Sequence, residues 1–193
     1  MEFTQEELNH LLKSGQTPLW LNNADLSGAD LSQTNLAKAR LLRANLSGAN
    51  LAGADLSGAD LTYANLSRAD LREAKLTMAG LSGANFTGAM LAGADFEEAD
   101  MSRSILSGAD LSGANLLRVN FSESNLSETN LTAANLSHSN LSEVSLEKAN
   151  LSQANLSHAL LREADLSDAT LDGANLDAAD TEFAIFPDGT IDN

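Results

Sequence analysis

The side chains that could carry chemistry are few, and no spacing among them builds an active site. The 193 residues include three histidines and no cysteine. Serines are plentiful, but they recur at one fixed place in a short repeat, and no recognisable motif sets a histidine beside one of them. The two glycine-rich motifs that bind phosphate groups, G-x-x-x-x-G-K-[ST] and G-x-G-x-x-G after a strand, are both missing from the sequence. The sequence therefore predicts no enzyme, no catalytic residue, no bound cofactor and no metal site.

Any functional side chain must be positioned by a five-residue repeat, A(D/N)LxG, which runs from Leu21 to Ile185. Five residues advance an α-helix by about 500°, so the leucines would form no apolar stripe on a helix. In a straight strand an odd repeat would send successive leucines to opposite faces. The chain must therefore turn once per repeat, with Leu and Ala pointing inward and the Asp or Asn between them pointing outward. The predicted core includes Leu26, Leu46, Leu66, Phe86, Leu106 and Leu126.

The corner of each repeat falls on the two residues that follow the inward leucine. The second of them is the place of nearly every glycine in the chain. Glycine at the third position of a four-residue turn is typical of a type II turn, where φ is positive. Arg43, Glu73 and Gln153 occupy the same place, so we expect a second turn type at those corners.

This pattern resembles the pentapeptide repeat family, and the resemblance covers nearly the whole chain with more than thirty consecutive copies. The resemblance implies an all-β solenoid: a right-handed quadrilateral β-helix with four repeats, and so twenty residues, per coil. Coils stacked about 4.8 Å apart would give roughly eight coils in a rod about 40 Å long. We expect this β-helix to occupy residues 19–185.

A solenoid exposes strand edges at both ends, so caps are expected there. Residues 1–18 predict an N-terminal α-helical cap, with Leu8, Leu11 and Leu12 lying over the first coil. Residues 186–193 follow the repeats and predict a short C-terminal plug. The first residues lack the apolar core of a secretory signal, and no stretch is apolar enough to span a membrane. Together with the lack of cysteine, this predicts a cytoplasmic protein.

Twenty residues per coil would stack outward side chains into columns. One column holds Glu123, Glu143 and Glu163, which could be a carboxylate ladder for a cation or a basic partner, or a row of solvated charges. The solvated row is favoured because like charges placed opposite one another repel. A second column holds Arg118, His138 and His158, which could be a two-ligand metal site or a pH switch, or ordinary corner residues. No third ligand is evident, so the ordinary interpretation is favoured.

Outward apolar residues are scarce, and they are the candidates for a partner-binding surface. They replace polar residues or glycine at outward positions of the repeat. By the twenty-residue count Met78, Met90, Ile105 and Leu117 fall within about two coils but on different faces, with Met78 and Leu117 on the same one. These candidates are Tyr63, Met78, Met90, Ile105, Leu117 and Leu160.

The chain is acidic, with 27 Asp and Glu against 11 Lys and Arg and a net charge of −16. This charge argues against direct binding to nucleic acid or to an anionic membrane. Along a rod of about 40 Å it gives about 0.4 charges per Å, against about 0.6 for duplex DNA. The resemblance implies a second option, because some pentapeptide repeat proteins mimic DNA and bind DNA gyrase.

Three functions follow from these observations. The favoured one is a rigid acidic rod that binds another protein, of unknown identity, as a scaffold or regulator. The alternatives are a DNA-mimicking modulator of gyrase and a purely structural spacer. Mimics of the gyrase type tend to dimerise through a C-terminal element, and only a short plug follows the repeats here. We therefore expect a monomer.

Overall fold

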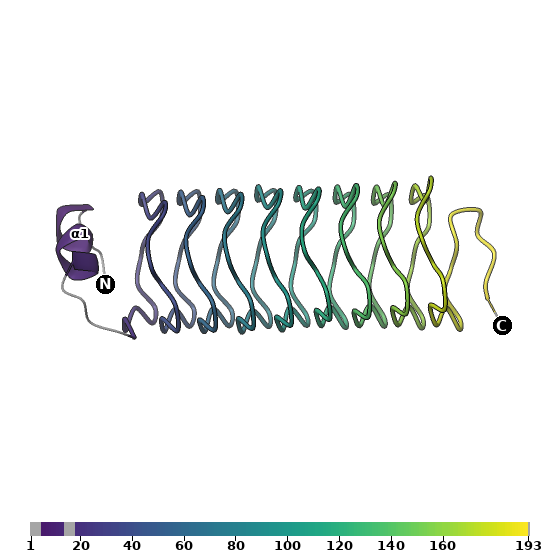
Figure 1. The fold of residues 1–193 in the computed structure, drawn as a ribbon, viewed down its shortest axis with the longest axis horizontal. Helices are drawn as coiled ribbons and strands as arrows, with labels where there is room; N and C mark the ends of the chain where they lie inside the picture. Colours follow the sequence, from purple (N-terminus) through teal and green to yellow (C-terminus); the bar gives the residue numbers. More distant parts are fainter. Residues whose placement is uncertain (1–4, 14–17, 193) are drawn as a thin grey trace.

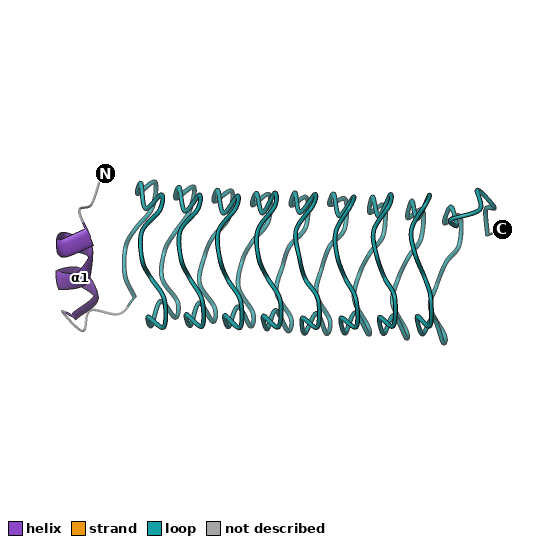
Figure 2. Cartoon of the chain, turned by 90° about the horizontal axis from the view of Figure 1, so that it is seen from above, coloured by secondary structure: helices purple, strands orange, loops and turns teal. Residues whose placement is uncertain are grey.

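In a computed structural model, which describes residues 5–13 and 18–192, the chain forms a straight rod of stacked coils (Figure 1). A short helix lies at one end of the rod and the C-terminal segment lies at the other. Parallel bridges join each outward Asp or Asn position to the residue twenty positions later. Between Trp20 and Ile185 these bridges form four ladders, so one coil comprises four repeats. Each bridge is an isolated residue pair, and Figure 2 accordingly draws the coils as loops.

The repeat from Asn50 to Ala54 shows how five residues satisfy their backbone donors. The N–H groups of Leu51 and Gly53 donate to carbonyls of the next coil, at 2.6 and 2.9 Å. The Asn50 N–H donates to a carbonyl of the previous coil at 2.9 Å, and the Ala54 N–H closes the turn on the Leu51 carbonyl at 3.0 Å. The fifth N–H, that of Ala52, donates to the Asn50 side chain at 3.2 Å. Every donor of the repeat is thus used, as a buried backbone requires.

The interior of the rod is filled with side chains from the repeat. The leucines at the predicted core positions, with Phe86 among them, are at most 2% exposed, and so are most of the alanines two residues before them. The rings of Phe86 and Phe96 meet edge to face at a centroid distance of 6.3 Å inside one coil. Where Ser or Thr replaces the inward alanine, as at Ser104, its hydroxyl donates to the carbonyl three residues earlier, here Met101, at 2.6 Å. The interior therefore tolerates a small polar side chain that carries its own acceptor.

The prediction of a second turn type is wrong. Arg43, Glu73 and Gln153 have φ values of 55°, 58° and 60°, in the same left-handed region as the corner glycines. This region costs an ordinary residue roughly 1–2 kcal/mol. Two hydrogen bonds hold each corner in place: the Arg43 N–H donates to the next coil at 2.9 Å, and the following Ala44 N–H closes the turn at 2.9 Å. One corner geometry therefore serves glycine and charged residues alike.

The N-terminal end is covered by helix α1 (Gln5–Lys13). Residues 1–4 and 14–17 of the predicted cap lie outside the described residues. Leu8 is buried against the core, and Leu11 and Leu12 are partly buried there. The Gln5 side-chain amide donates to the Asp30 carbonyl at 2.9 Å and accepts from the Asp30 N–H at 3.0 Å. This amide therefore takes the place of a peptide group from a preceding coil and blocks one exposed edge of the first coil.

At the C-terminal end the chain reverses once. The Phe186 N–H donates to the Thr190 carbonyl at 2.8 Å, and Ile185 forms an antiparallel bridge with Ile191. The Thr181 hydroxyl donates to the Asp192 carboxylate at 2.5 Å. This reversal supplies a strand against the last coil in the region predicted to be a plug. Residue 193 lies outside the described part of the chain.

Candidate interaction surface

The rod presents four faces, which we name by their ladders. Face 1 follows the ladder from Trp20 to Asp180, face 2 that from Asp25 to Ile185, face 3 that from Asp30 to Thr170, and face 4 that from Asn35 to Asn175. From each repeat, a face presents the bridge residue and the second and third residues after it. Because the interior is nearly the same in every coil, what distinguishes one face from another is these outward side chains.

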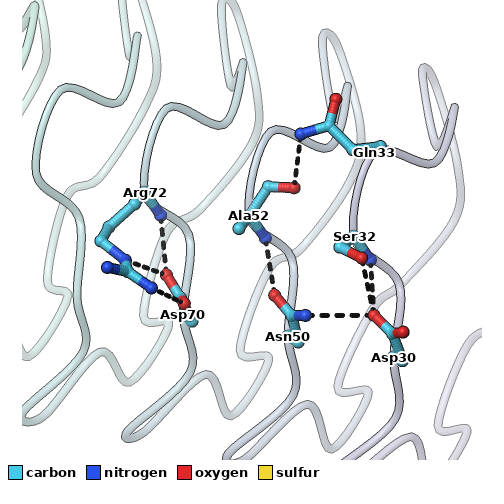
Figure 3. A network of polar contacts seen from close by, with 7 residues as sticks. All are labelled: Asp30, Ser32, Gln33, Asn50, Ala52, Asp70 and Arg72. Carbon is cyan, nitrogen blue, oxygen red and sulfur yellow. Dashed lines mark hydrogen bonds and ion pairs between the residues drawn. The ribbon is translucent and has the colours of Figure 1, made fainter.

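The Asp and Asn side chains at the bridge positions have a structural role. On face 3, the Asp30 carboxylate accepts the N–H of Ser32 at 3.2 Å and its hydroxyl at 2.7 Å (Figure 3). The Asn50 amide accepts the N–H of Ala52 in the same way and donates its own N–H to Asp30 at 3.1 Å. These side chains therefore cap the corner that follows them, and they link one coil to the next.

The amide links run in one direction along the rod. The longest chain starts at Asn175 on face 4 and passes through Asn155, Asn135 and Asn115, with donor–acceptor distances of 2.9–3.4 Å. It ends on the carboxylate of Asp95. The chains on the other faces also end, at their N-terminal side, on an aspartate, since a carboxylate accepts and does not need to donate.

These hydrogen bonds lower the pKa values of the carboxyls that accept them. The Ser32 hydroxyl and N–H hold the pKa of Asp30 below its usual value, and Ser27 does the same for the pKa of Asp25. The Arg72 side chain, which donates to Asp70 at 2.6 and 2.9 Å, lowers the pKa of Asp70 (Figure 3). Part of the acidity of the chain thus holds the corners together.

The six outward apolar candidates do not form one patch. Tyr63 and Leu160 lie on face 1, Met78 and Leu117 on face 4, Met90 on face 3 and Ile105 on face 2. Leu117 is partly buried, whereas Met78 is 65% exposed. The structure thus distributes these residues over all four faces, as the twenty-residue count predicts, and brings no more than two of them to any face.

The two charged columns are also in place, and each contains a direct contact. Glu123 heads the glutamate column of face 1 and accepts a two-point ion pair from Arg103 at 3.0 and 3.1 Å, which lowers the pKa of Glu123. On face 4, the rings of His138 and His158 are stacked at 4.8 Å and are nearly parallel. Arg118, in the same column, pairs with Glu98 at 3.2 Å.

Within residues 5–13 and 18–192, no group of three or more His, Cys, Asp or Glu side chains is arranged to hold a metal ion. No helix in the described part of the chain is long and apolar enough to cross a membrane.

Face 1 carries aromatic rings that lie against arginines near the N-terminal end. The Arg40 guanidinium lies 5.9 Å from the centre of the Trp20 ring, and that of Arg43 lies 5.9 Å from the centre of the Tyr63 ring. The Tyr63 ring lies over Gly83 of the next coil, so closely that a Cβ at Gly83 would sit 2.4 Å from the ring. These contacts fix two exposed aromatic side chains in place.

Charge is unevenly spread along the rod. Residues 121–193 include thirteen acidic and two basic residues, whereas residues 1–120 include fourteen acidic and nine basic residues. The C-terminal coils therefore carry most of the net charge. The N-terminal coils carry most of the arginines and both exposed aromatic rings that contact them.

Two features of this surface were missed in the sequence. The corner-capping role of Asp and Asn could have been read from the recurrent Asp/Asn-x-Ser/Thr spacing, which is typical of an Asx turn. The Tyr63–Gly83 contact joins residues twenty apart and needs a side-chain orientation, which the repeat pattern does not contain.

Comparison with known proteins gives consistent matches. A family model described as pentapeptide repeats (8 copies) matches residues 21–51, 39–77 and 79–116, and a pentapeptide repeat region model matches residues 99–176. No curated protein sequence matches the chain.

Among solved structures, the chain is similar to HetL of the cyanobacterium Nostoc sp. strain PCC 7120. HetL is described as a pentapeptide repeat protein involved in heterocyst differentiation regulation; it shares 35% identity over 99% of both chains, with a TM-score of 0.52. Full-length QnrB1, a plasmid-mediated fluoroquinolone resistance protein, matches with 21% identity and a TM-score of 0.51, over 81% of this chain and 79% of its own. At that identity QnrB1 shows only a common fold.

The four ladders, the filled interior and the corner every five residues agree with both kinds of match. The protein is a right-handed β-helical solenoid and belongs to the pentapeptide repeat family.

Proposed function

We propose that this protein is a non-enzymatic rod that binds another protein along one face and acts as a scaffold or regulator. The observation that carries the proposal is the combination of a uniform filled interior with four unlike faces. A filled interior offers no room for a substrate, whereas a rigid face can hold side chains at fixed spacing for a partner. The proposal includes a cytoplasmic location, which rests on the cysteine-free composition.

Face 1 is the proposed binding surface. Trp20 and Tyr63 are 73% and 59% exposed, and both rings are held against arginines. Trp, Tyr and Arg dominate the binding energy of protein interfaces, because they bury a large area at low entropic cost. HetL, with the same fold and 35% identity, is described as involved in regulation, which supports a regulatory role here.

The test is a quantitative capture experiment. The immobilised wild-type chain should retain a protein that the Trp20→Ser/Tyr63→Ser variant loses. The Met90→Ser/Ile105→Ser variant removes comparable apolar side chains from faces 3 and 2 and should retain it. Direct titration with the purified partner then has to reproduce the same order of affinities. Equal capture by all three baits would refute face 1 as the surface, and no specific capture would leave the structural spacer as the function.

The acidic C-terminal coils favour the second candidate, a DNA-mimicking modulator of gyrase. Glu143 and Glu163 stand one coil apart on face 1, and thirteen acidic residues lie beyond residue 120. Such a surface could occupy a positively charged DNA channel.

A supercoiling assay with purified gyrase separates this candidate from the first. A DNA mimic should inhibit the enzyme or protect it from quinolones, with binding that weakens as salt rises, and Glu143→Gln/Glu163→Gln should reduce the effect. No effect of the wild-type chain would remove gyrase from consideration and leave the first proposal intact.

A further inference from the structure

We propose that two copies of this chain pair side by side and antiparallel through face 1. The inference names a partner for that face, and it rests on the proposed function only in treating face 1 as a binding surface. The monomer expected from the sequence followed from the short C-terminal plug, which bears on end-to-end contacts and not on contacts between faces.

The exposed apolar side chains of face 1 lie at both of its ends. Eight large apolar residues are exposed among the described residues, and four of them belong to this face. Trp20 and Tyr63 lie toward the N-terminal end, and Leu160 and Phe183, 44% and 50% exposed, lie toward the C-terminal end. The other four are Met78, Met90, Ile105 and Ile191. No other ladder face of the described coils therefore carries comparable apolar ends.

Charge on face 1 has opposite sign at the two ends. Arg40 and Arg43 accompany the N-terminal aromatic rings. Glu143 precedes Leu160, and Glu163 lies between Leu160 and Phe183. The neighbouring Arg162 is paired with Asp180 and Glu182. The Arg43 guanidinium contacts the Tyr63 ring, and neither it nor Glu143 or Glu163 has an ion-pair partner in residues 5–13 and 18–192. One cation and two carboxylates are thus available for another molecule.

Reversal of a second copy matches these ends to each other. With a two-fold axis near the coils of Leu81 and Met101, Arg43 of one copy comes opposite Glu143 and Glu163 of the other. Trp20 then comes near the apolar residues at the far end, and symmetry repeats both contacts. A parallel arrangement would put arginine against arginine and glutamate against glutamate. Face 1 is therefore self-complementary in the antiparallel direction, as an isologous dimer interface requires.

The middle of face 1 is low and carries little charge. Gly80 has no side chain, the Tyr63 ring lies over Gly83, and Arg103 is neutralised by its own ion pair with Glu123. The exposed Asp100 carboxylate, which accepts from the Ser102 N–H and the Asn120 amide, is the acidic group that the two copies bring toward each other there. Five residues of about 3.3 Å each make a face at most about 16 Å wide, so a rod about 40 Å long offers up to about 650 Å² per copy, at the lower end of the roughly 600–1,000 Å² per partner of standard interfaces. The area is therefore sufficient for a specific dimer.

The net charge of −16 per chain opposes association at long range. At about 0.15 M salt the Debye length is about 8 Å, so the distant charges are screened more than the groups in contact. At about 0.01 M it is about 30 Å, and the repulsion of the whole rods prevails. The dimer should therefore be stronger at the higher of these two salt concentrations.

Sedimentation equilibrium of the full chain tests the proposal, with concentrations up to about 0.5 mM to include weak interfaces. The wild-type chain should sediment as a concentration-dependent dimer at about 0.15 M salt. Arg43→Glu should abolish the dimer, and so should Glu143→Arg/Glu163→Arg, since each homodimer then sets like charges together in both half-sites. We expect association to weaken by about 100-fold in each variant.

Mixing the two charge-reversed variants is the decisive step. In one half-site of the mixed pair, the glutamate introduced by Arg43→Glu faces the two arginines introduced in the other variant. The second half-site keeps the natural Arg43 opposite the natural Glu143 and Glu163. A heterodimer should therefore form with about wild-type affinity, although neither variant pairs with itself. Circular dichroism has to show that both variants are folded.

Charge-matched controls lie on other faces. Arg68→Glu on face 2 changes the net charge as Arg43→Glu does, and Glu73→Arg/Glu128→Arg on faces 3 and 2 matches the double variant; both should dimerise like the wild type. A monomeric wild type, a dimer that survives charge reversal, or a mixture that stays monomeric would each overturn the inference. None of these results affects capture of another protein by face 1, so the two proposals fail separately.

Discussion

Replacing Gly83 by alanine should destabilise the solenoid by about 1–2 kcal/mol more than the same replacement at Gly113. Both glycines occupy the same corner position, with φ values of 68° and 64°. A Cβ at Gly113 meets nothing within 4 Å, whereas at Gly83 it would sit 2.4 and 2.5 Å from two carbons of the Tyr63 ring. The two variants therefore share the cost of a left-handed alanine and differ in one steric contact.

The magnitude follows from what the Tyr63 ring must give up. An alanine at either position costs roughly 1–2 kcal/mol for its backbone conformation. At Gly83 the ring must also leave its place, which removes the contact with Arg43, worth about 0.5–1 kcal/mol at an exposed site. Losing a ring contact of about 20–40 Å² of apolar area costs roughly a further 0.5–1 kcal/mol.

A double-mutant cycle with Tyr63→Ala measures this difference directly. Urea unfolding followed by circular dichroism gives the free energy of unfolding for the wild type, both single variants and the double variant. Without the tyrosine ring, Gly83→Ala should cost no more than Gly113→Ala. A coupling energy near zero, or equal costs for the two glycine variants, would refute the packing of Tyr63 on Gly83.

Three further predictions follow from the same structure. Leu106 is fully buried, so Leu106→Lys places an unpaired charge in the interior. It should lower the free energy of unfolding by several kcal/mol and unfold the neighbouring coils, which hydrogen exchange of their amides would show. Unchanged protection of those amides would contradict this. Gln5→Glu keeps the shape of the side chain but removes the donor to the Asp30 carbonyl. The Asp30 amide should therefore lose about 1 kcal/mol of protection against hydrogen exchange, so that it exchanges roughly five- to tenfold faster. A similar loss of protection in the last coil would indicate a general effect instead. The pKa values of Asp30 and Asp70 are lowered in the folded chain, so these carboxyls bind protons more weakly there than in the unfolded chain. The stability that their ionised forms give to the folded chain is therefore present above about pH 4 and is lost as the pH falls through the folded-state pKa values. Urea midpoints at successive pH values should therefore fall only on the acid side of about pH 4, and a decline already at about pH 5–6 would contradict this.

The interior follows from the sequence because it depends on the period alone, whereas the ladders depend on four repeats per coil, a number that the resemblance to the family implies and the period does not fix. A leucine every fifth residue and an alanine two residues earlier leave a single way to bury both, and the structure buries both. The prediction at the Arg43 corner is wrong because the two backbone hydrogen bonds that hold the corner outweigh the intrinsic φ preference of arginine. Cooperative stacking, repeated in every coil, outweighs a local cost of roughly 1–2 kcal/mol.

The surface follows from the sequence only in part. The twenty-residue count places Glu123, His138 and Tyr63 on their faces. It does not show that the Glu123 carboxylate is neutralised, that the histidine rings are stacked or that the tyrosine ring covers a glycine. Each of these depends on the side-chain orientation of two residues in adjacent coils, and the orientation is decided by their mutual contact. Face 1 differs from the other faces in the combination of exposed aromatic rings with the arginines that contact them, which the repeat pattern does not contain.

The register of four repeats per coil gives a five-residue insertion an unusual meaning. In most folds an insertion inside a core element breaks the packing. Here an added Asn-Leu-Ser-Gly-Ala would extend the same inward Leu and Ala series, so every later residue would move on by one quarter of a turn around the axis. Everything beyond the insertion would keep its neighbours along the axis but point in a new direction relative to everything before it. An insertion between Arg43 and Glu143 would therefore move Glu143 and Glu163 off the face that carries Arg43. Insertions of five, ten and fifteen residues would rotate the C-terminal part of the surface by one, two and three quarters of a turn relative to the N-terminal part. An insertion of twenty would restore the alignment and lengthen the rod by one coil.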